Sequence, residues 1–267
     1  MFLSNISSIY SPPFPTHPPE LWGKGLKMKS WLGNVGANAV KAREANIFDL
    51  LEMGTGKRTK LLCLGCATGK FTLTASERIG GKVNMYGIDI NKSFLKEAKK
   101  KGIKTIPSDL NKKLPLKPNS FDVVLSDQVI EHLVDVENYI REIHRVLKPS
   151  GYAIISTENL SSWTNLFTML LGYGPSPMHY SDEKNISGIP KLSPSYMTDV
   201  NYGYPPHTKL FTFHVLKELF KLHGFRIEKA TGGGYYPAPK FLMRSMSKID
   251  PRHAPYITIK IRKTGIS

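Results

Sequence analysis

Two short segments carry residue types that suit a nucleotide ligand. Residues 60–71 read Lys-Leu-Leu-Cys-Leu-Gly-Cys-Ala-Thr-Gly-Lys-Phe, an apolar run followed by a turn of small residues and the start of a helix. Because small residues leave backbone N–H groups bare, such a turn lets a ligand approach the chain closely. An acidic residue after the next strand completes a cofactor signature. Asp89 stands at that place, in the run Tyr-Gly-Ile-Asp-Ile.

Further polar residues end the neighbouring expected strands. Asp109 follows a short third strand, and Ser126 and Gln128 follow a fourth. Ligands of a doubly wound sheet bind beyond the carboxyl ends of its strands, so we expect these side chains to converge. The Asp89 carboxylate can accept from both hydroxyls of a ribose, and Asp109 from the exocyclic amine of a purine. An adenosine-shaped ligand satisfies both.

Alternating strands and helices must position these residues. Apolar runs predict strands at 60–64, 83–90, 105–106, 121–126, 152–156, 225–230 and 256–262. Helical spacing predicts helices at 37–52, 71–79, 93–100, 136–147, 163–171 and 213–223, with a break at 148–151. This order predicts an α/β fold, a doubly wound and mainly parallel seven-stranded sheet of Rossmann-like type.

The chain is long enough for one large domain with an insertion. We expect residues 1–36 to form an N-terminal tail and 37–267 the domain, with a lid insertion at about 159–208, after the fifth strand. The first residues lack a charged region, and no apolar run is long enough to span a bilayer. Two cysteines fit a reducing compartment, so we expect a cytoplasmic location.

The chain is strongly basic, with 37 Lys and Arg against 21 Asp and Glu and a net charge of +16. Such a charge attracts nucleic acid or anionic membranes. The lysines are spread along the chain without interleaved aromatic residues, however, which favours a solvated surface over a nucleic-acid interface. Nucleic acid stays open as a partner, and the oligomeric state is open as well.

The chain resembles the class I S-adenosylmethionine-dependent methyltransferases, within the type 11-like group of small-molecule and lipid-quinone methyltransferases. Residues 62–69 match the frame of the first motif of that family, and Asp89 matches its ribose-binding position. Further matches lie at 108–110, 121–126, 129–133, 147–152 and 211–225. The resemblance covers residues 37–262, and the joint occurrence of these motifs is specific where each alone is weak.

The resemblance implies S-adenosylmethionine as the cofactor. The residues expected to bind it are Gly65, Cys66, Ala67, Gly69, Asp89, Ile90, Asp109, Leu110, Ser126 and Gln128. Two positions depart from the family pattern. Cys63 stands where the family has an acidic residue, and Ala67 replaces the middle glycine, which costs little if φ there is negative.

No metal is expected from the cysteines. Cys63 and Cys66 form a C-x-x-C, but Cys63 falls inside a strand, whereas a redox pair opens a helix. No other cysteine exists to complete a four-thiolate zinc site.

The implied activity is methyl transfer to an oxygen or nitrogen of a small-molecule or lipid- or glycan-linked acceptor. His132 follows the fourth strand, and its ordinary pKa suits proton removal near neutrality. His207 lies in Tyr-Pro-Pro-His-Thr-Lys, which resembles a position where related enzymes carry histidine. Each histidine is alternatively a packed polar residue. The sequence also leaves open an RNA methyltransferase and a non-catalytic S-adenosylmethionine-binding protein.

A methyltransferase of RNA or DNA bases would be expected to carry a different motif. The fourth strand continues as Ser-Asp-Gln-Val at 126–129, not as the Asn/Asp-Pro-Pro-Tyr/Phe run of enzymes that methylate base amino groups.

Overall fold

The computed structural model describes residues 31–54, 58–181, 183–190, 205–235, 238 and 240–264, with the side chains of 31–37 and 240 excepted. Its strands are β1 (Thr59–Leu64), β2 (Val83–Asp89), β3 (Lys104–Pro107), β4 (Phe121–Asp127), β5 (Leu147–Glu158), β6 (Phe225–Gly233) and β7 (Tyr256–Lys263). Its helices are α2 (Trp31–Asp49), α3 (Lys70–Ile79), α4 (Lys92–Lys100), α5 (Val136–Val146), α6 (Trp163–Leu170), α7 (Phe213–Leu222) and α8 (Lys240–Ile249), with short 3-10 turns η2 (Ile130–His132) and η3 (Pro251–His253).

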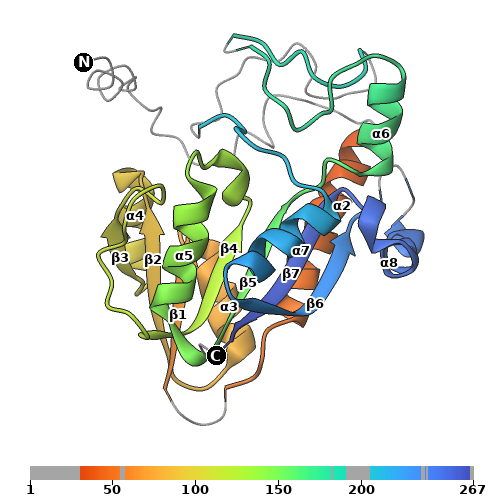
Figure 1. Ribbon diagram of the computed structural model, residues 1–267. Helices are drawn as coiled ribbons and strands as arrows, with labels where there is room; N and C mark the ends of the chain where they lie inside the picture. Colours follow the sequence, from red (N-terminus) through yellow and green to blue (C-terminus); the bar gives the residue numbers. More distant parts are fainter. Residues whose placement is uncertain are drawn as a thin grey trace.

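The strands form one seven-stranded sheet in the order β3-β2-β1-β4-β5-β7-β6 (Figure 1). Strands β1 to β5 pair in parallel, whereas β7 runs antiparallel between β5 and β6. The chain moves outward from β1 in one direction through β2 and β3, and then in the other through β4 and β5. This change of direction between β1 and β4 is the topological switch point where such sheets bind ligands. The predicted fold class is confirmed.

Helices cover both faces of the sheet because neighbouring strand residues point to opposite sides. Leu62 packs in a core with α5 and α7, whereas Leu61 packs in a second core with α2, α3 and α4. Both leucines are fully buried. Strands buried on both faces explain the unbroken apolar runs in the sequence.

Helix α2 lies against the far edge of the sheet through a run of glycines in β6. The Asn46 side chain donates to the Gly232 carbonyl at 2.7 Å. A Cβ on Gly233 would lie 3.1 Å from the Arg43 Cα, and one on Gly234 would lie 2.6 Å from the Ala39 Cβ. The glycines therefore allow the two backbones to lie in contact, because a side chain at these positions would clash with α2.

Three features differ from the sequence-based expectation. Helix α2 begins at Trp31, so residues 31–36, expected in the tail, are helical, while 1–30 lie outside the described residues. The expected break at 148–151 is a bulge inside β5, since Phe121 pairs with Leu147 and Val123 with Tyr152. Helix α8 has no counterpart among the predicted elements.

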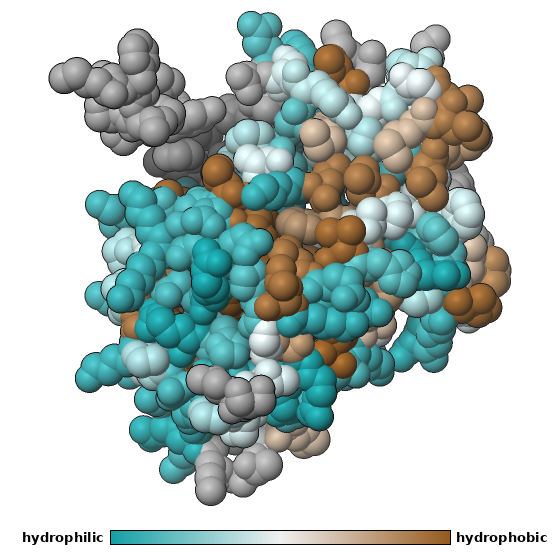
Figure 2. Space-filling view, viewed as in Figure 1, coloured by the Kyte–Doolittle hydropathy of each residue, from teal (hydrophilic) through white to brown (hydrophobic). Residues whose placement is uncertain are grey.

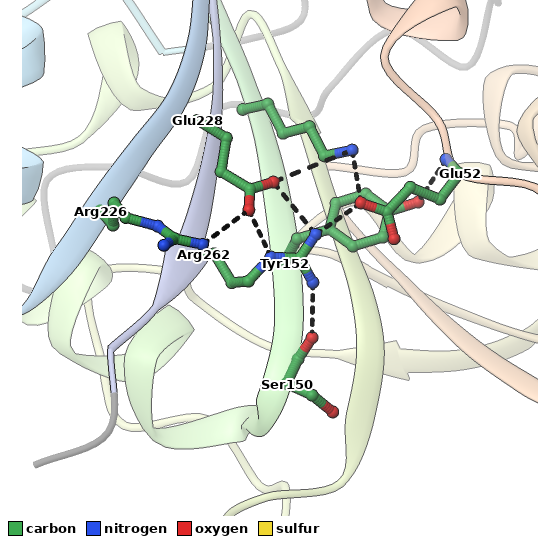
Figure 3. A network of polar contacts seen from close by, with 7 residues as sticks. Glu52, Ser150, Tyr152, Arg226, Glu228 and Arg262 are labelled. Atoms are coloured by element: carbon green, nitrogen blue, oxygen red, sulfur yellow. Dashed lines mark hydrogen bonds and ion pairs between the residues drawn. The ribbon is translucent and has the colours of Figure 1, made fainter.

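An ionic network ties the segment after α2 to the last strands (Figure 3). Arg262 pairs with both Glu228 and Glu52. Lys260, two residues earlier on the same face of β7, reaches Glu52 at 2.7 Å. Its ammonium also lies 4.4 Å from the centre of the Tyr152 ring. The network fixes the end of the sheet opposite the site described next.

The segment expected to form a lid is described at 159–181, 183–190 and 205–208, so a covering role stays a prediction. It leaves the sheet directly after β5 and, in Figure 1, its described parts lie beyond the carboxyl ends of the parallel strands. Among the described residues, no helix is both long and apolar enough to cross a membrane.

Candidate functional site

The turn after β1 is built on three left-handed residues. The φ angles are +66° at Gly65, +43° at Ala67 and +77° at Gly69. A Cβ on Gly65 would lie 2.5 Å from Val129, and one on Gly69 would lie 2.4 Å from Ile103. Both glycines are therefore required by backbone conformation and by packing. The turn leads into α3 without a side-chain cap, which leaves the first N–H groups of the helix for a ligand at the turn.

Ala67 has a positive φ, so the condition under which alanine would cost little at this position is not met. A left-handed conformation costs a residue with a Cβ about 1–2 kcal/mol. The strain is held by one hydrogen bond, because the Ala67 N–H donates to Asp89 Oδ2 at 2.9 Å. The turn and the carboxylate beside it are thus a single unit.

Replacing Ala67 with glycine is expected to stabilise the protein by about 1 kcal/mol, because glycine adopts this φ without strain. Chemical denaturation measures the change in the free energy of unfolding. Ala42→Gly, inside α2, is the matched control and is expected to lose about 1 kcal/mol. A loss of stability in Ala67→Gly would contradict the strain described here.

Asp89 closes β2 with its carboxylate buried against the turn. The residue is 7% exposed, and its Oδ1 accepts from the Asn91 N–H at 2.8 Å. Burial raises the pKa of this carboxyl above its ordinary value, while the N–H donors oppose that shift. Each carboxylate oxygen can accept a second hydrogen bond. The next residue, Ile90, is 62% exposed and offers an apolar surface beside the carboxylate.

Asp109 follows β3 and anchors a turn. Its Oδ1 accepts from the backbone N–H of Asn111 at 2.9 Å and from the side-chain amide of the same residue at 3.0 Å. Asn111 in turn accepts from the N–H groups of Val134 and Asp135, which places the turn against the start of α5. Leu110 between them is buried. The Oδ2 of Asp109 is the atom left for a ligand amine, with Lys112 at 4.0 Å.

The two polar residues expected at the end of β4 differ in what they offer. Ser126 Oγ accepts from the buried Tyr139 hydroxyl at 2.5 Å, so its side chain serves the core. Gln128 has a φ of +55°, and its N–H donates to the Ser156 carbonyl. Its buried Nε2 has no hydrogen-bond partner among the described residues. A buried amide without a partner fits a ligand that accepts from it.

The cysteines are two free, buried thiols. Burial raises the pKa of Cys63 to about 12 and that of Cys66 further. Neither is therefore a thiolate near neutral pH. Cys66 packs where a Cβ on Gly87 would meet its sulfur at 2.6 Å.

A buried acidic cluster lies next to this turn, and the sequence pattern does not predict it. The cluster consists of Asp127, Glu131 and Glu158, from the ends of β4, η2 and β5. Arg43 of α2 donates to Asp127 Oδ2 at 3.0 Å, and Thr157 donates to Glu131 Oε2 at 2.9 Å. Glu158 could have been found as the last residue of the fifth strand, whereas Arg43 comes from a helix whose docking the sequence does not reveal.

Burial weakens all three acids of this cluster. It raises the pKa of Asp127 to about 6, with Arg43 opposing the shift. It raises the pKa of Glu131 to about 8 and that of Glu158 to about 7. The nearby Glu158 and Asp127 add to the rise at Glu131. The cluster therefore holds more acid groups than its arginine neutralises.

The structure brings the two expected catalytic histidines together. The ring centres of His132 and His207 lie 4.6 Å apart, and His179 stacks on His207 at 4.8 Å. Burial lowers the pKa of His132 to about 4 and lowers that of His207. Both are thus neutral near pH 7. A group with so low a pKa is a weak general base, although it is always in the basic form.

Comparison with known proteins agrees with this geometry. Residues 62–155 match the family model of a methyltransferase domain. A demethylmenaquinone methyltransferase of Staphylococcus aureus (strain JH9) is 32% identical over 108 residues, which cover 39% of this chain and 44% of that protein. The chain thus spans less than half the length of the curated relatives it matches.

Solved structures share the fold over most of the chain. An S-adenosylmethionine-dependent methyltransferase from Mesorhizobium loti has a TM-score of 0.58 at 21% identity, covering 84% of this chain and 100% of that one. A possible histamine N-methyltransferase from Thermotoga maritima has a TM-score of 0.57 at 19% identity, covering 86% and 92%. At these identities the likeness shows the fold alone.

Proposed function

We propose that the chain is a class I S-adenosylmethionine-dependent methyltransferase that methylates an oxygen or nitrogen atom of a small-molecule or lipid- or glycan-linked acceptor. The match of residues 62–155 to a methyltransferase domain and the shared fold support this proposal. One observation carries the proposal: at the switch point, the turn after β1 is hydrogen-bonded to the acid that ends β2, and both lie within the matched residues 62–155. The proposed domain is 37–267, with the helical residues 31–36 added to it.

The residues present fit the cofactor. Asp89 keeps two acceptor sites for ribose hydroxyls, and Ile90 supplies an exposed apolar surface for a ring. Asp109 Oδ2 is placed for an exocyclic amine, and the Gln128 amide lacks a partner among the described residues. We assign Gly65, Cys66, Ala67 and Gly69 to the methionyl end by their backbone, and Leu110 and Ser126 to packing beneath the site.

When bound, S-adenosylmethionine supplies a methyl group on a sulfonium, already a strong electrophile. The chain has to hold an acceptor atom in line with the S–CH₃ bond and exclude water. An acceptor hydroxyl must also lose its proton. His132 and His207 are the proposed groups for that proton, since both lie beyond β4, where acceptor and methyl group would meet.

An apolar acceptor is supported by the apolar surface of α6, which belongs to the segment expected to form the lid, and of α8. Large apolar side chains are exposed on α6 and α8, as Figure 2 shows. Phe167 is 56% exposed and Leu170 82% exposed on α6, and Phe241 is 78% exposed on α8. The Staphylococcus aureus relative is named a demethylmenaquinone methyltransferase. We therefore favour an aromatic or quinone-like acceptor over a sugar.

The test is transfer of labelled methyl from S-adenosylmethionine to fractionated cell extract, divided into RNA, lipid, glycan and small-molecule pools. We expect label in the lipid or small-molecule pool. Label in RNA alone would support an RNA methyltransferase instead, the alternative that the net charge of +16 leaves open. Cofactor binding without label in any pool would support a non-catalytic protein. Lack of binding would contradict the site itself.

A further inference from the structure

We propose that Glu131, His132 and His207 form a binding site for a divalent transition-metal cation. One ligand atom from each of these side chains lies within 4.8 Å of the other two. Two imidazoles and one carboxylate are a donor set for Zn²⁺ and its neighbours in the first transition row. Mg²⁺ prefers oxygen ligands alone. The proposal departs from the expectation of no metal, which rested on the cysteines.

The histidines are held in the form that binds metals. His132 Nδ1 lies 2.6 Å from the Pro205 carbonyl, and His207 Nδ1 lies 2.5 Å from the Pro177 carbonyl. Because a carbonyl oxygen only accepts, these two contacts favour the tautomer with the proton on Nδ1 and the lone pair on Nε2. A hydrogen bond from the other ring nitrogen to a carbonyl is the usual support of a metal-ligating histidine.

The carboxylate supplies an independent sign of a missing ligand. Glu131 is completely buried, and its Oε1 has no hydrogen-bond partner among the described residues. The other oxygen accepts from the Thr157 hydroxyl, which fixes the orientation of the group. A buried oxygen without a partner is costly, and a bound cation would remove that cost.

The surrounding charge also calls for a cation. Asp127, Glu131 and Glu158 gather on one side, and Arg43 is bonded to Asp127. His207 Nδ1 lies 3.7 Å from Glu158 Oε2, so this third acid borders the proposed site. These acids outnumber the arginine bonded among them, and a divalent ion beside them would hold them in their charged form.

The backbone holds the two halves of the site together. His207 comes from a distant segment, yet the next two residues, Thr208 and Lys209, donate their N–H groups to the Glu131 carbonyl at 2.8 and 3.2 Å. The Thr208 hydroxyl also donates to the Leu133 carbonyl at 2.8 Å. The segment is thereby fastened to η2. The three ligand atoms lie within 4.8 Å of one another, and small shifts that keep these hydrogen bonds would bring them to the spacing of about 3.4 Å between the ligands of a tetrahedral Zn²⁺ site.

The catalytic consequence rests on the proposed function, whereas cation binding does not. A bound divalent ion lowers the pKa of a hydroxyl that coordinates it. With the ion bound, His132 and His207 would hold it and would not accept the proton. The acceptor O–H bond would break with its proton passing to solvent, and the oxygen would form the new O–CH₃ bond. The S–CH₃ bond would break, with its electron pair left on sulfur. The favoured acceptor is therefore a ring with a free hydroxyl.

The experiment is calorimetric titration of the chelator-treated, full-length protein with Zn²⁺, and in parallel with Mg²⁺. We expect one equivalent of Zn²⁺ to bind, with Mg²⁺ binding far more weakly. Glu131→Gln and His207→Ala should each weaken Zn²⁺ binding by at least about tenfold. The exposed His214→Ala is the control and should bind as the parent protein does. Substitution with Co²⁺ provides a second readout, a visible absorption band lost in the same two variants.

Two outcomes would overturn the proposal. One is the absence of saturable Zn²⁺ binding to the parent protein, and the other is that folded Glu131→Gln and His207→Ala bind Zn²⁺ as tightly as the parent protein does. Circular dichroism establishes the folding of each variant, and Glu131→Gln keeps the shape of the buried side chain. Binding of S-adenosylmethionine is measured on the same samples. Cofactor binding without Zn²⁺ binding would contradict the metal site alone, whereas a lack of cofactor binding would contradict the proposed function.

Discussion

Replacing Asp89 with alanine is expected to weaken S-adenosylmethionine binding by at least about tenfold, or 1.4 kcal/mol. The buried carboxylate is the proposed acceptor for the ribose, and hydrogen bonds to a charged group are worth about 1.5–3 kcal/mol each. The variant also loses the bond that holds Ala67 in its left-handed conformation. Both losses act on the same ligand, and calorimetry measures the change in Kd.

The control for this variant is Asp135→Ala. Asp135 caps α5 by accepting from the Asn138 N–H, so its loss costs about 1 kcal/mol of stability without touching the site. Its cofactor affinity should equal that of the parent protein. If Asp89→Ala folds and binds the cofactor unchanged, the adenosine site proposed for this chain is wrong.

Arg43→Met is expected to destabilise the protein by about 3–5 kcal/mol at pH 8. Both partners of the Arg43–Asp127 pair are largely buried, with side chains 11% and 15% exposed. The variant leaves Asp127 without its cation beside Glu131 and Glu158. Methionine retains most of the apolar stem, so the loss reflects the charge. Urea denaturation gives the change in the free energy of unfolding.

The sign of the pH dependence follows from the raised pKa of Asp127, about 6 in the folded protein. An acid whose pKa is raised by folding destabilises the protein as the pH rises past its ordinary value near 4. Without Arg43, the pKa of Asp127 rises further, and the carboxyl is neutral at pH 5. The defect should therefore shrink at pH 5 and grow toward pH 8.

Two further variants separate this pair from ordinary ion pairs. Asp127→Asn added to Arg43→Met removes the uncompensated charge and should restore most of the stability. Arg244→Met breaks an exposed pair with Asp49, whose side chains are 78% and 56% exposed, and should change stability by less than about 1 kcal/mol. An equal loss in Arg43→Met and Arg244→Met would show that burial of the pair is unimportant.

The sheet could be predicted from the sequence because its strands are buried on both faces and read as unbroken apolar runs. The positions of Asp89 and Asp109 followed from the rule that parallel strands end at one edge. The positive φ of Ala67 could not be read from residue type, since alanine ordinarily avoids that region. It is imposed by the hydrogen bond from its N–H to Asp89.

The contact between the two histidines and that between Arg43 and Asp127 show the other limit of prediction from sequence. The sequence points to both His132 and His207, but nothing in their spacing says that their ring centres lie 4.6 Å apart. That contact depends on the pairing of the 205–209 segment with η2, and Arg43 reaches Asp127 through the docking of α2. Contacts between elements that are distant in sequence leave no periodic signal in the pattern of residues.

The seating of α2 on the glycines of β6 has a consequence for biosynthesis. Asn46 and Gly232 are 186 residues apart, so α2 leaves the ribosome well before its partner strand exists. At about 5–20 residues per second, that interval is roughly 10–40 s. Over this time Ala39, which in the finished protein is buried and packs against Gly234, lacks that contact on the nascent chain. The growing polypeptide thus carries a helix with an uncovered apolar face, which is the kind of surface that chaperones bind.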